Sequence, residues 1–407
     1  MKVVWLKSEY LFPPDTGGKT RAYHLLRHLH KQIDVDYLGF RPAAQDRQEP
    51  SWKECANRVH TIHKPEEQKS GAAFYGRVAA NLVSATPYFV KRNCSPELRG
   101  VLRDLETGGV DIVVCDSLDM ACNIDFATPA RKILFHPSIE TSLWRQRYES
   151  TTSLMRKSYF NYETKRMASF ESAMCNRFDL VVVVSEDDRL TLQSEFHVKA
   201  PIEIIPVGVA CDYFAPQPSR AVVPKRLMFS GSLELLSNID QLLWFASEIL
   251  PLIKRRHPDV TLDIVGKDPA VEIIALGMKD ASIFVTGWVD DIRLYLAQAD
   301  IYIVPLRVPG GRRVKVYEAL AMRKPVVATS YGVEGLLLKH GRHLLVADTP
   351  RDFADAVCAL LDDPHQKATL ADNGWRLMNE QFDYSIMARL FVNLLHRVAA
   401  SPARPRR

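Results

Sequence analysis

Residues 301–332 read IYIVPLRVPGGRRVKVYEALAMRKPVVATSYG, and this stretch decides the class of fold. The unbroken apolar run Ile301–Val304 has the length and composition of a strand buried on both faces. A loop with two glycines follows, a helix is expected from about Arg312, and the run Val326–Ala328 predicts the next strand. Strand, helix and strand in this order are typical of an α/β protein with a parallel sheet.

The same alternation continues along most of the chain. Short apolar runs predict strands at Val3–Leu6, Val35–Leu38, Ile112–Val114, Ile133–Phe135, Leu180–Val184, Leu227–Phe229, Leu262–Val265, Ile283–Val285, Ile301–Val304, Val326–Ala328 and Leu344–Val346. Amphipathic segments such as Ala22–Leu29, Leu242–Leu252 and Phe353–Leu361 lie between them and predict helices. The whole chain is therefore expected to be α/β.

The series of strands and helices runs twice. A stretch rich in proline and glycine, residues 206–219, has little periodicity and indicates a linker. We predict one doubly wound, Rossmann-like domain over residues 1–205 and another over 220–383, facing each other across a cleft. The final helix, 384–399, can pack on either domain, and the tail 400–407 is expected to be disordered.

Length and composition agree with this organisation. The chain has 407 residues, enough for about two large domains or three small ones. It is 47% hydrophobic and 25% charged, which argues against a disordered, collagenous or polytopic membrane protein. The formal net charge of +5 allows phosphate-rich ligands or anionic lipid surfaces. A nucleic-acid partner is not expected, because such proteins usually carry a larger and more clustered positive excess.

The cysteines and the N-terminus indicate a compartment. The seven cysteines are scattered, without C-x-x-C spacing or a zinc-like set, and this fits a reducing cytosol better than a disulfide framework. No secretory signal and no stretch of 18 apolar residues is visible. We therefore expect a cytoplasmic protein, with peripheral contact with the inner face of a membrane as a further expectation.

Loops after strands are the places to look for chemistry in doubly wound domains. Gly17 and Gly18 follow the first strand and precede a helix expected from about Arg21; they could offer amides to an anion or form an ordinary turn. The helical residues 19–31 hold four Lys or Arg and no acid, a pattern of a solvated face or of contact with an anionic acceptor or membrane. His136 directly follows a strand, where it could transfer protons or serve a structural role.

Three strand ends in the second half carry small residues. They are Gly231 with Ser232, then Gly266, then Gly287 followed by Trp288 and Val289. Small residues allow a ligand to approach the backbone closely. Trp288 could lie beside a base or pack in the core.

The loop quoted at the outset concentrates the charge. The amides of Gly310 and Gly311, at a helix start, suit a phosphate, and Arg307, Arg312, Arg313 and Lys315 can add charge-assisted hydrogen bonds. Glu318 lies one to two turns into the helix, where it can accept hydrogen bonds from ribose hydroxyls. The alternative is a basic solvated turn with an ordinary helical glutamate.

These motifs together resemble a known family. The pattern Arg313-x-Lys315-x-x-Glu318-Ala-Leu-Ala, with Pro325–Thr329 and Gly332-x-Glu334-Gly335, resembles the donor-binding segment of family 4 glycosyltransferases, which have the GT-B fold. Further matches follow the family's order: Gly17-Gly18, His136, Val184-Ser185-Glu186, Ile205–Pro216, Gly231-Ser232 with Asn238, Gly266, and Thr286–Asp291. The nearest likeness is to the bacterial branch found in exopolysaccharide gene clusters.

The resemblance implies transfer of a sugar, with retention, from a UDP-, GDP- or dTDP-sugar to a saccharide, lipid-linked or small-molecule acceptor. It implies no metal and no cofactor, and it makes residues 1–205 the acceptor side and 220–383 the donor side. By the same resemblance Gly17 and Gly18 lie near the donor, and His136 bonds to the donor sugar. Arg313 and Lys315 lie near the phosphates, Gly231, Ser232, Gly310 and Gly311 line the donor site, Glu318 holds the ribose, and Gly287, Trp288 and Val289 flank the base.

Two departures from the family pattern leave alternatives open. Gly310 stands where the family often has a glutamate eight positions before Glu318, and no base is present in residues 232–238. Arg307, Arg312, Arg313 or Lys315 could supply the missing charge. A GT-B-type nucleotide-sugar epimerase, or a non-catalytic nucleotide-sugar-binding partner of another transferase, are the rival hypotheses.

Overall fold

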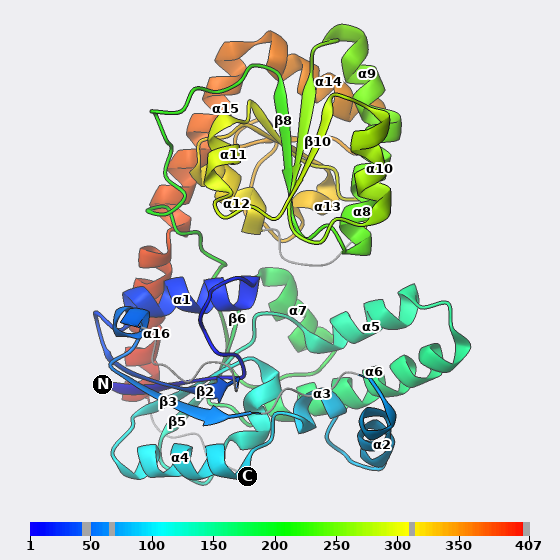
Figure 1. Ribbon diagram of the computed structural model, residues 1–407. Coiled ribbons are helices and arrows are strands. Elements are labelled where there is room, and N and C mark those ends of the chain that lie inside the picture. The colour runs from blue at the N-terminus through cyan, green and yellow to red at the C-terminus, as the bar shows by residue number, and fades with distance from the viewer. Residues whose placement is uncertain (43–49, 65–69, 309–313, 402–407) are drawn as a thin grey trace. The chain divides into compact units, whose positions relative to one another are not determined.

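The computed structural model describes residues 1–42, 50–64, 70–308 and 314–401 (Figure 1). The chain divides into two compact units. Unit 1 comprises Met1–Val207 together with Met387–Arg407, and unit 2 comprises Gly208–Ile386. The tail expected to be disordered, residues 400–407, lies outside the described residues from 402 onward.

Unit 1 is a seven-stranded sheet in the order β3-β2-β1-β4-β5-β6-β7, and every neighbouring pair is parallel. Its strands are β1 (Lys2–Lys7), β2 (Asp34–Arg41), β3 (Arg58–His63), β4 (Ile112–Asp116), β5 (Arg131–Phe135), β6 (Leu180–Val183) and β7 (Ile202–Ile204). Its helices are α1 (Gly17–Leu29), α2 (Ala72–Asn81), α3 (Tyr88–Lys91), α4 (Pro96–Thr107), α5 (Glu140–Ser150), α6 (Leu154–Cys175) and α7 (Glu186–Ser194). Two 3₁₀ turns, η1 (Pro50–Glu54) and η2 (Leu118–Asn123), complete the described elements.

Unit 2 is a six-stranded parallel sheet in the order β10-β9-β8-β11-β12-β13. Its strands are β8 (Arg226–Ser230), β9 (Thr261–Val265), β10 (Ile283–Gly287), β11 (Ile301–Val304), β12 (Val326–Ala328) and β13 (Leu345–Val346). Its helices are α8 (Leu236–Trp244), α9 (Leu250–Arg256), α10 (Val271–Lys279), α11 (Arg293–Gln298), α12 (Val314–Ala321), α13 (Ser330–Val333), α14 (Pro350–Asp362) and α15 (Pro364–Leu377). Two π turns, η3 (Phe245–Ile249) and η4 (Met378–Phe382), continue α8 and α15.

The central strands are buried because their sequences are apolar on both faces. All five residues of β4 and all four of β6 and β11 are buried. The predicted strands are all present, whereas β3 and β7 were not predicted. Both lie at the edges of their sheet, and β3 (RVHTIH) places exposed polar residues in its outer positions, so neither has a continuous apolar run.

Two helix predictions need correction. Helix α1 begins at Gly17 rather than near Arg21, because the side chain of Thr16 caps it by accepting from the backbone N–H of Lys19. The glycine pair therefore forms the first helical turn. The predicted helix Leu242–Leu252 is instead shared by α8, the π turn η3 and α9.

The last helix, α16 (Tyr384–Ala400), returns the chain to unit 1. The Phe391 ring lies 5.5 Å from that of Trp5 and 5.6 Å from that of Phe135, between centroids, so residues from β1, β5 and α16 share one aromatic cluster. None of the described helices is both long enough and apolar enough to cross a bilayer.

Candidate functional site

In unit 1 the strand order reverses between β1 and β4, and the carboxyl ends of these strands carry opposite charges. Lys7 ends β1, Asp116 ends β4, and Lys7 Nζ lies 3.3 Å from Asp116 Oδ2. Asp116 is fully buried and also accepts from Trp5 Nε1 at 3.2 Å and from the guanidinium of Arg21. The reversal point of this sheet is thus occupied by the protein's own ion cluster.

The cluster joins two cations to Asp116, and Glu9 Oε2, 3.6 Å from Lys7 Nζ, supplies a second carboxylate. Burial alone would raise the pKa of Asp116, but Arg21 and Lys7 hold that pKa below its usual range. Arg21 and His24 belong to the helical residues 19–31, for which a solvated face or contact with an anionic surface was predicted, and both are buried, so neither alternative holds for these two residues. Arg21 pairs with Asp116 inside the fold, and its guanidinium carbon lies 4.7 Å from the centre of the Phe135 ring.

Gly18 lies beside this cluster. A Cβ atom at Gly18 would come within 3.3 Å of Glu9 Oε2 and 3.9 Å of Lys7 Nζ, whereas one at Gly17 would meet nothing within 4 Å. The start of α1 therefore lies close to a carboxylate, Glu9, and to an ammonium group, Lys7, in addition to the amides of Gly17 and Gly18.

His136 directly follows β5 and is fully buried. Its Nε2 lies 2.6 Å from Glu171 Oε1 of α6, and this carboxylate also accepts from the backbone N–H groups of Glu140 and Thr141 at 2.8 and 3.0 Å. The Thr141 hydroxyl is a further donor. Burial acts to raise the pKa of Glu171, but the hydrogen bonds from His136 and Thr141 keep it below the ordinary value.

This arrangement fixes the proton on the imidazole. A carboxylate with four donors accepts from His136, so Nε2 carries the hydrogen. Nδ1 has no hydrogen-bond partner among the described residues, and in a neutral imidazole it carries the lone pair. Glu171 and Thr141 were not predicted from the sequence. They lie on α6 and α5, and no sequence motif links either residue to His136.

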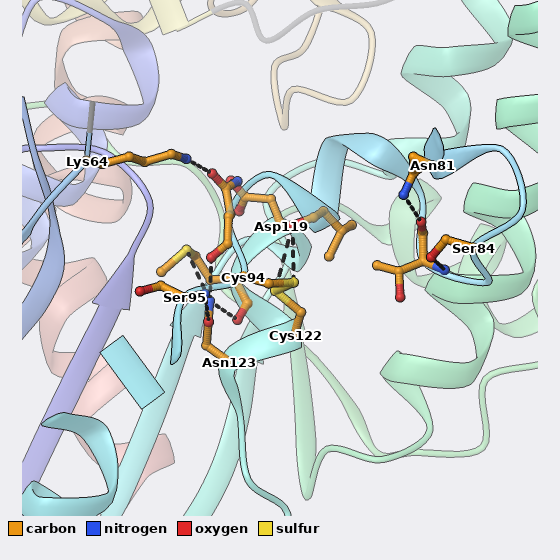
Figure 2. The surroundings of a disulfide bond; sticks show 12 residues. Lys64, Asn81, Ser84, Cys94, Ser95, Asp119, Cys122 and Asn123 are labelled. Atoms are coloured by element: carbon orange, nitrogen blue, oxygen red, sulfur yellow. Dashed lines mark hydrogen bonds between the residues drawn. A yellow bond between two sulfur atoms is a disulfide. The ribbon is translucent and has the colours of Figure 1, made fainter. Parts of the chain in front are cut away.

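A disulfide also lies in unit 1, contrary to the expectation of cysteines without disulfides (Figure 2). Cys94 and Cys122 are joined, with their Cα atoms 5.6 Å apart, and they link the turn before α4 to η2. Asp119 of η2 accepts from the Asn93 amide at 2.9 Å. The sequence could not predict the pair, since 28 residues separate its members.

In unit 2 the strand order reverses between β8 and β11, and the neighbouring strand ends carry glycines. The N–H of Gly266 donates to the carbonyl of Gly287 at 3.1 Å. A Cβ at Gly266 would come within 1.7 Å of the Gly231 carbonyl oxygen, so only glycine fits there. Gly287 has φ +69°, a conformation that glycine adopts readily. The structure therefore brings together three of the small strand ends noted in the sequence.

Lys315 and Glu318 of α12 lie next to this edge. Lys315 Nζ donates to the carbonyl of Ser230 at 3.2 Å and lies 4.1 Å from the centre of the Phe229 ring. Ser230 also shares a 2.6 Å hydrogen bond with the hydroxyl of Tyr302, a contact that was not predicted from the sequence. Burial raises the pKa of Glu318 to about 7, although nearby Lys315 lowers it. A buried carboxyl group with its pKa raised in this way makes Glu318 of α12 a candidate ligand-binding residue.

The remaining predicted residues divide into three cases. Trp288 is 64% exposed, so the alternative that it packs in the core is wrong, whereas Val289 is partly buried against the core. Arg307 is paired with Asp240, Nε to Oδ2 at 3.0 Å, so its charge is already compensated. Gly310, Gly311 and Arg313, together with Arg312, lie outside the described residues. In the part of the chain that is described, no group of three or more His, Cys, Asp and Glu could hold a metal ion.

Comparison with known proteins places this geometry in context. Residues 224–363 match a family described as glycosyl transferases group 1. A curated relative from Mycolicibacterium smegmatis, named GDP-mannose-dependent alpha-(1-6)-phosphatidylinositol monomannoside mannosyltransferase, is 30% identical over 228 residues. This alignment covers 51% of the chain and 60% of the relative, so the chain spans about three fifths of that protein's length.

Solved structures resemble nearly the whole chain. A sucrose-phosphate synthase from Thermosynechococcus elongatus has a TM-score of 0.71 at 16% identity, covering 98% of this chain and 100% of its own. Anabaena HepE, solved in complex with UDP and glucose, has a TM-score of 0.64 at 14% identity and covers 97% and 99%. At these identities the likeness concerns the fold. The predicted α/β fold with two Rossmann-like domains of the GT-B type is confirmed, and so is the resemblance to glycosyltransferases.

Proposed function

With residues 224–363 resembling group 1 glycosyltransferases on a GT-B fold, we propose that the protein is a family 4-type glycosyltransferase. It transfers a sugar from a nucleotide-diphosphate sugar to an acceptor, with retention at the anomeric carbon and without a metal ion. The named relative uses GDP-mannose and HepE was solved with UDP and glucose, so UDP-, GDP- and dTDP-sugars are the donors to test.

One observation carries the proposal: the strand edge of unit 2 combines closely packed glycines with a carboxyl group that titrates near neutrality. Gly231 and Gly266 allow the strand ends to pack closely, and Gly287 leaves open space where a Cβ would stand. Glu318, once ionised, can accept hydrogen bonds from the two ribose hydroxyls, and the exposed ring of Trp288 can lie against the base. A nucleotide has three matching parts: phosphates for the glycine strand ends, a ribose for Glu318 and a base for Trp288.

The chemistry follows from the charge that develops during transfer. Cleavage of the sugar–phosphate bond leaves negative charge on the diphosphate, so catalysis requires groups that stabilise this charge in the transition state. Lys315 lies at this edge, and we assign the same task to the amides of Gly310 and Gly311 and to Arg313. The lone pair of His136 Nδ1 suits a hydroxyl of the donor sugar, which would donate to it.

The acceptor is proposed to bind on the side of unit 1. A saccharide, lipid-linked or small-molecule acceptor is consistent with the family, and the exopolysaccharide-type branch favours polysaccharide biosynthesis in the cytoplasm. We propose no nucleic-acid partner.

The experiment is a thermal-shift screen of the protein against UDP-, GDP-, dTDP- and ADP-sugars, followed by product analysis with the donor that binds. Binding to the native state raises the transition temperature by mass action. Transfer to an added saccharide or lipid-linked acceptor, with the anomeric configuration retained by NMR, supports the proposal. Interconversion of the donor sugar without acceptor would identify an epimerase, and tight binding without turnover on any acceptor would identify a non-catalytic binding protein.

A further inference from the structure

Unit 1 exposes its large apolar side chains mainly in one region. Among its described residues, Leu190 and Leu390 are exposed elsewhere, and six others lie on or next to α2 and α6: Tyr75, Leu82, Val83, Leu154, Met155 and Tyr162. We call these six the α2–α6 face. Val83 is 95% exposed and Met155 is 85% exposed, so this face is a concentration of uncovered apolar surface.

Hydrogen bonds hold the two parts of this face together. The Tyr162 hydroxyl donates to the Leu82 carbonyl at 2.6 Å. The Arg166 guanidinium donates to the carbonyls of Asn81 at 3.0 Å and Thr86 at 2.9 Å, which fixes the turn after α2 against α6. Figure 1 shows α5 and α6 as a pair of helices that extends away from the sheet of unit 1, with α2 beside α6.

The helical spacing aligns the apolar residues of α6. Met155, Tyr159 and Tyr162 follow at intervals of four and three residues and therefore lie on one side of the helix, about 10 Å from first to last. Helix α2 (AAFYGRVAAN) buries only Asn81, so almost all of its apolar surface is uncovered. The exposed apolar residues of α2 and α6 thus lie on two segments that the Tyr162–Leu82 and Arg166–Asn81 hydrogen bonds join.

The charge around the face is strongly positive. Residues 71–92 contain Arg77, Lys91 and Arg92 and no acid, and residues 154–166 contain Arg156, Lys157, Lys165 and Arg166 with Glu163 as the one acid. Glu163 is itself buried and paired with Arg166, so neither of these two charges counts toward the surface, and Arg156, Lys157 and Lys165 are the bases that α6 adds. Apolar side chains among basic ones fit the interface of a bilayer that contains anionic lipids.

We propose that the α2–α6 face docks on an anionic membrane surface, with its apolar side chains inserted among the lipids and its bases at the phosphates. This contact differs from the one that the basic residues 19–31 suggested, because Arg21 and His24 of that segment are buried. It goes beyond the proposed function, since vesicle binding requires neither donor nor transfer.

The test uses the full-length protein and vesicles of phosphatidylglycerol and phosphatidylcholine in equal parts, with vesicles of phosphatidylcholine alone as reference. Wild-type protein should sediment with the anionic vesicles, and raised salt should weaken the binding. The double variant Val83→Glu with Met155→Glu should bind about tenfold less tightly or worse. Its melting temperature should remain that of the wild type, since both side chains are exposed.

Helix α10 offers a matched control. Met278 is 82% exposed and lies near exposed Val271 and Ile274, but this helix has one acid and one base, Glu272 and Lys279. Met278→Glu should therefore leave vesicle binding unchanged. The charge variant Lys157→Glu with Lys165→Glu, which keeps the apolar residues, should reduce binding to anionic vesicles by a similar factor.

Three results would overturn the proposal. They are failure of the wild type to sediment with anionic vesicles, equal sedimentation of the Val83/Met155 variant, and equal binding to neutral and anionic vesicles. If sedimentation velocity shows self-association that the same double variant abolishes, while vesicles are not bound, the face joins two copies of this chain instead.

Discussion

The two sheets of the protein reverse their strand order in the same way but fill the reversal point differently. In unit 1 it contains Lys7 and Arg21, both of which pair with the buried carboxylate of Asp116 inside the fold. In unit 2 it is lined by Gly231 and Gly266, with Lys315 and Glu318 beside them. The first point is thus filled by the protein's own ion pairs, whereas the second is the place where we propose that the donor brings its own phosphates.

The largest expected effect breaks the ion cluster of unit 1. Asp116→Asn leaves Arg21 buried without its anion and Lys7 with only the exposed Glu9, so we expect a loss of about 3–5 kcal/mol in the free energy of unfolding. Asp34→Asn is the control, because Asp34 is an exposed partner of Arg58, and its loss should cost under about 1 kcal/mol. Denaturant unfolding of both variants measures the difference; equal effects would contradict a structural role for Asp116.

The same cluster predicts how the free energy of unfolding changes with pH. Because the pKa of Asp116 is lower in the folded state than in the unfolded chain, its stabilisation is present above the unfolded pKa and is lost as pH falls through the lower folded value. Wild-type stability should therefore fall at acidic pH more steeply than that of Asp116→Asn.

The next effect concerns the glycine edge of unit 2. Gly266→Ala places a Cβ 1.7 Å from the Gly231 oxygen and forces the two strand ends apart, which should cost about 2–3 kcal/mol and abolish donor binding. Gly100→Ala in α4 is the control, since its Cβ would meet nothing within 4 Å, and it should be neutral or slightly stabilising. Calorimetry and donor titration provide the two readouts.

A smaller effect tests the pairing of His136 with Glu171. In Glu171→Gln the amide N–H₂ can face the imidazole, and the proton should then move from Nε2 to Nδ1. ¹⁵N NMR of the ring nitrogens detects this change, and turnover should fall about tenfold or more, as in His136→Ala. Glu163→Gln, on the same helix, should leave the His136 signals unchanged. An unaltered tautomer in Glu171→Gln would show that the carboxylate does not set it.

The smallest effect is at Glu318. Glu318→Gln should weaken donor binding about tenfold at pH 8, through loss of the charged acceptor for ribose hydroxyls. In the wild type, donor affinity should decrease as pH falls below about 7, because the carboxylate becomes protonated. Because the pKa of Glu318 is raised in the folded state, its protonated form stabilises the fold at low pH, and this contribution is lost as pH rises through about 7. At pH 8 the wild type therefore holds a buried charged carboxylate, which Glu318→Gln lacks. The melting temperature of this variant should then exceed that of the wild type by a few degrees.

Those residues also show what the sequence can predict. Buried strands such as β4 and β11 were found because their apolar runs are continuous, and the glycines were found because they follow such runs. The edge strands β3 and β7 were missed because half-exposed strands lack that signal.

Side-chain partners were harder to predict. Glu171 lies 35 residues from His136 in sequence and Asp116 lies 95 residues from Arg21, so only the folded chain brings them together. The same reason explains why the basic residues 19–31 predicted a solvated face or contact with an anionic acceptor or membrane. The helical spacing shows which residues face away from the apolar stripe. It does not show that Arg21 pairs with the buried carboxylate of Asp116.

The return of α16 to unit 1 has a consequence for synthesis on the ribosome. Phe391 completes the aromatic cluster around Trp5 and Phe135, yet it is made after the whole of unit 2. The first domain to emerge is thus the last to be completed, whereas the second, Gly208–Ile386, is continuous and can finish folding before it. A nascent chain halted after unit 2 should hold an unfinished first core that exposes Trp5, and that core should depend on chaperones until translation ends.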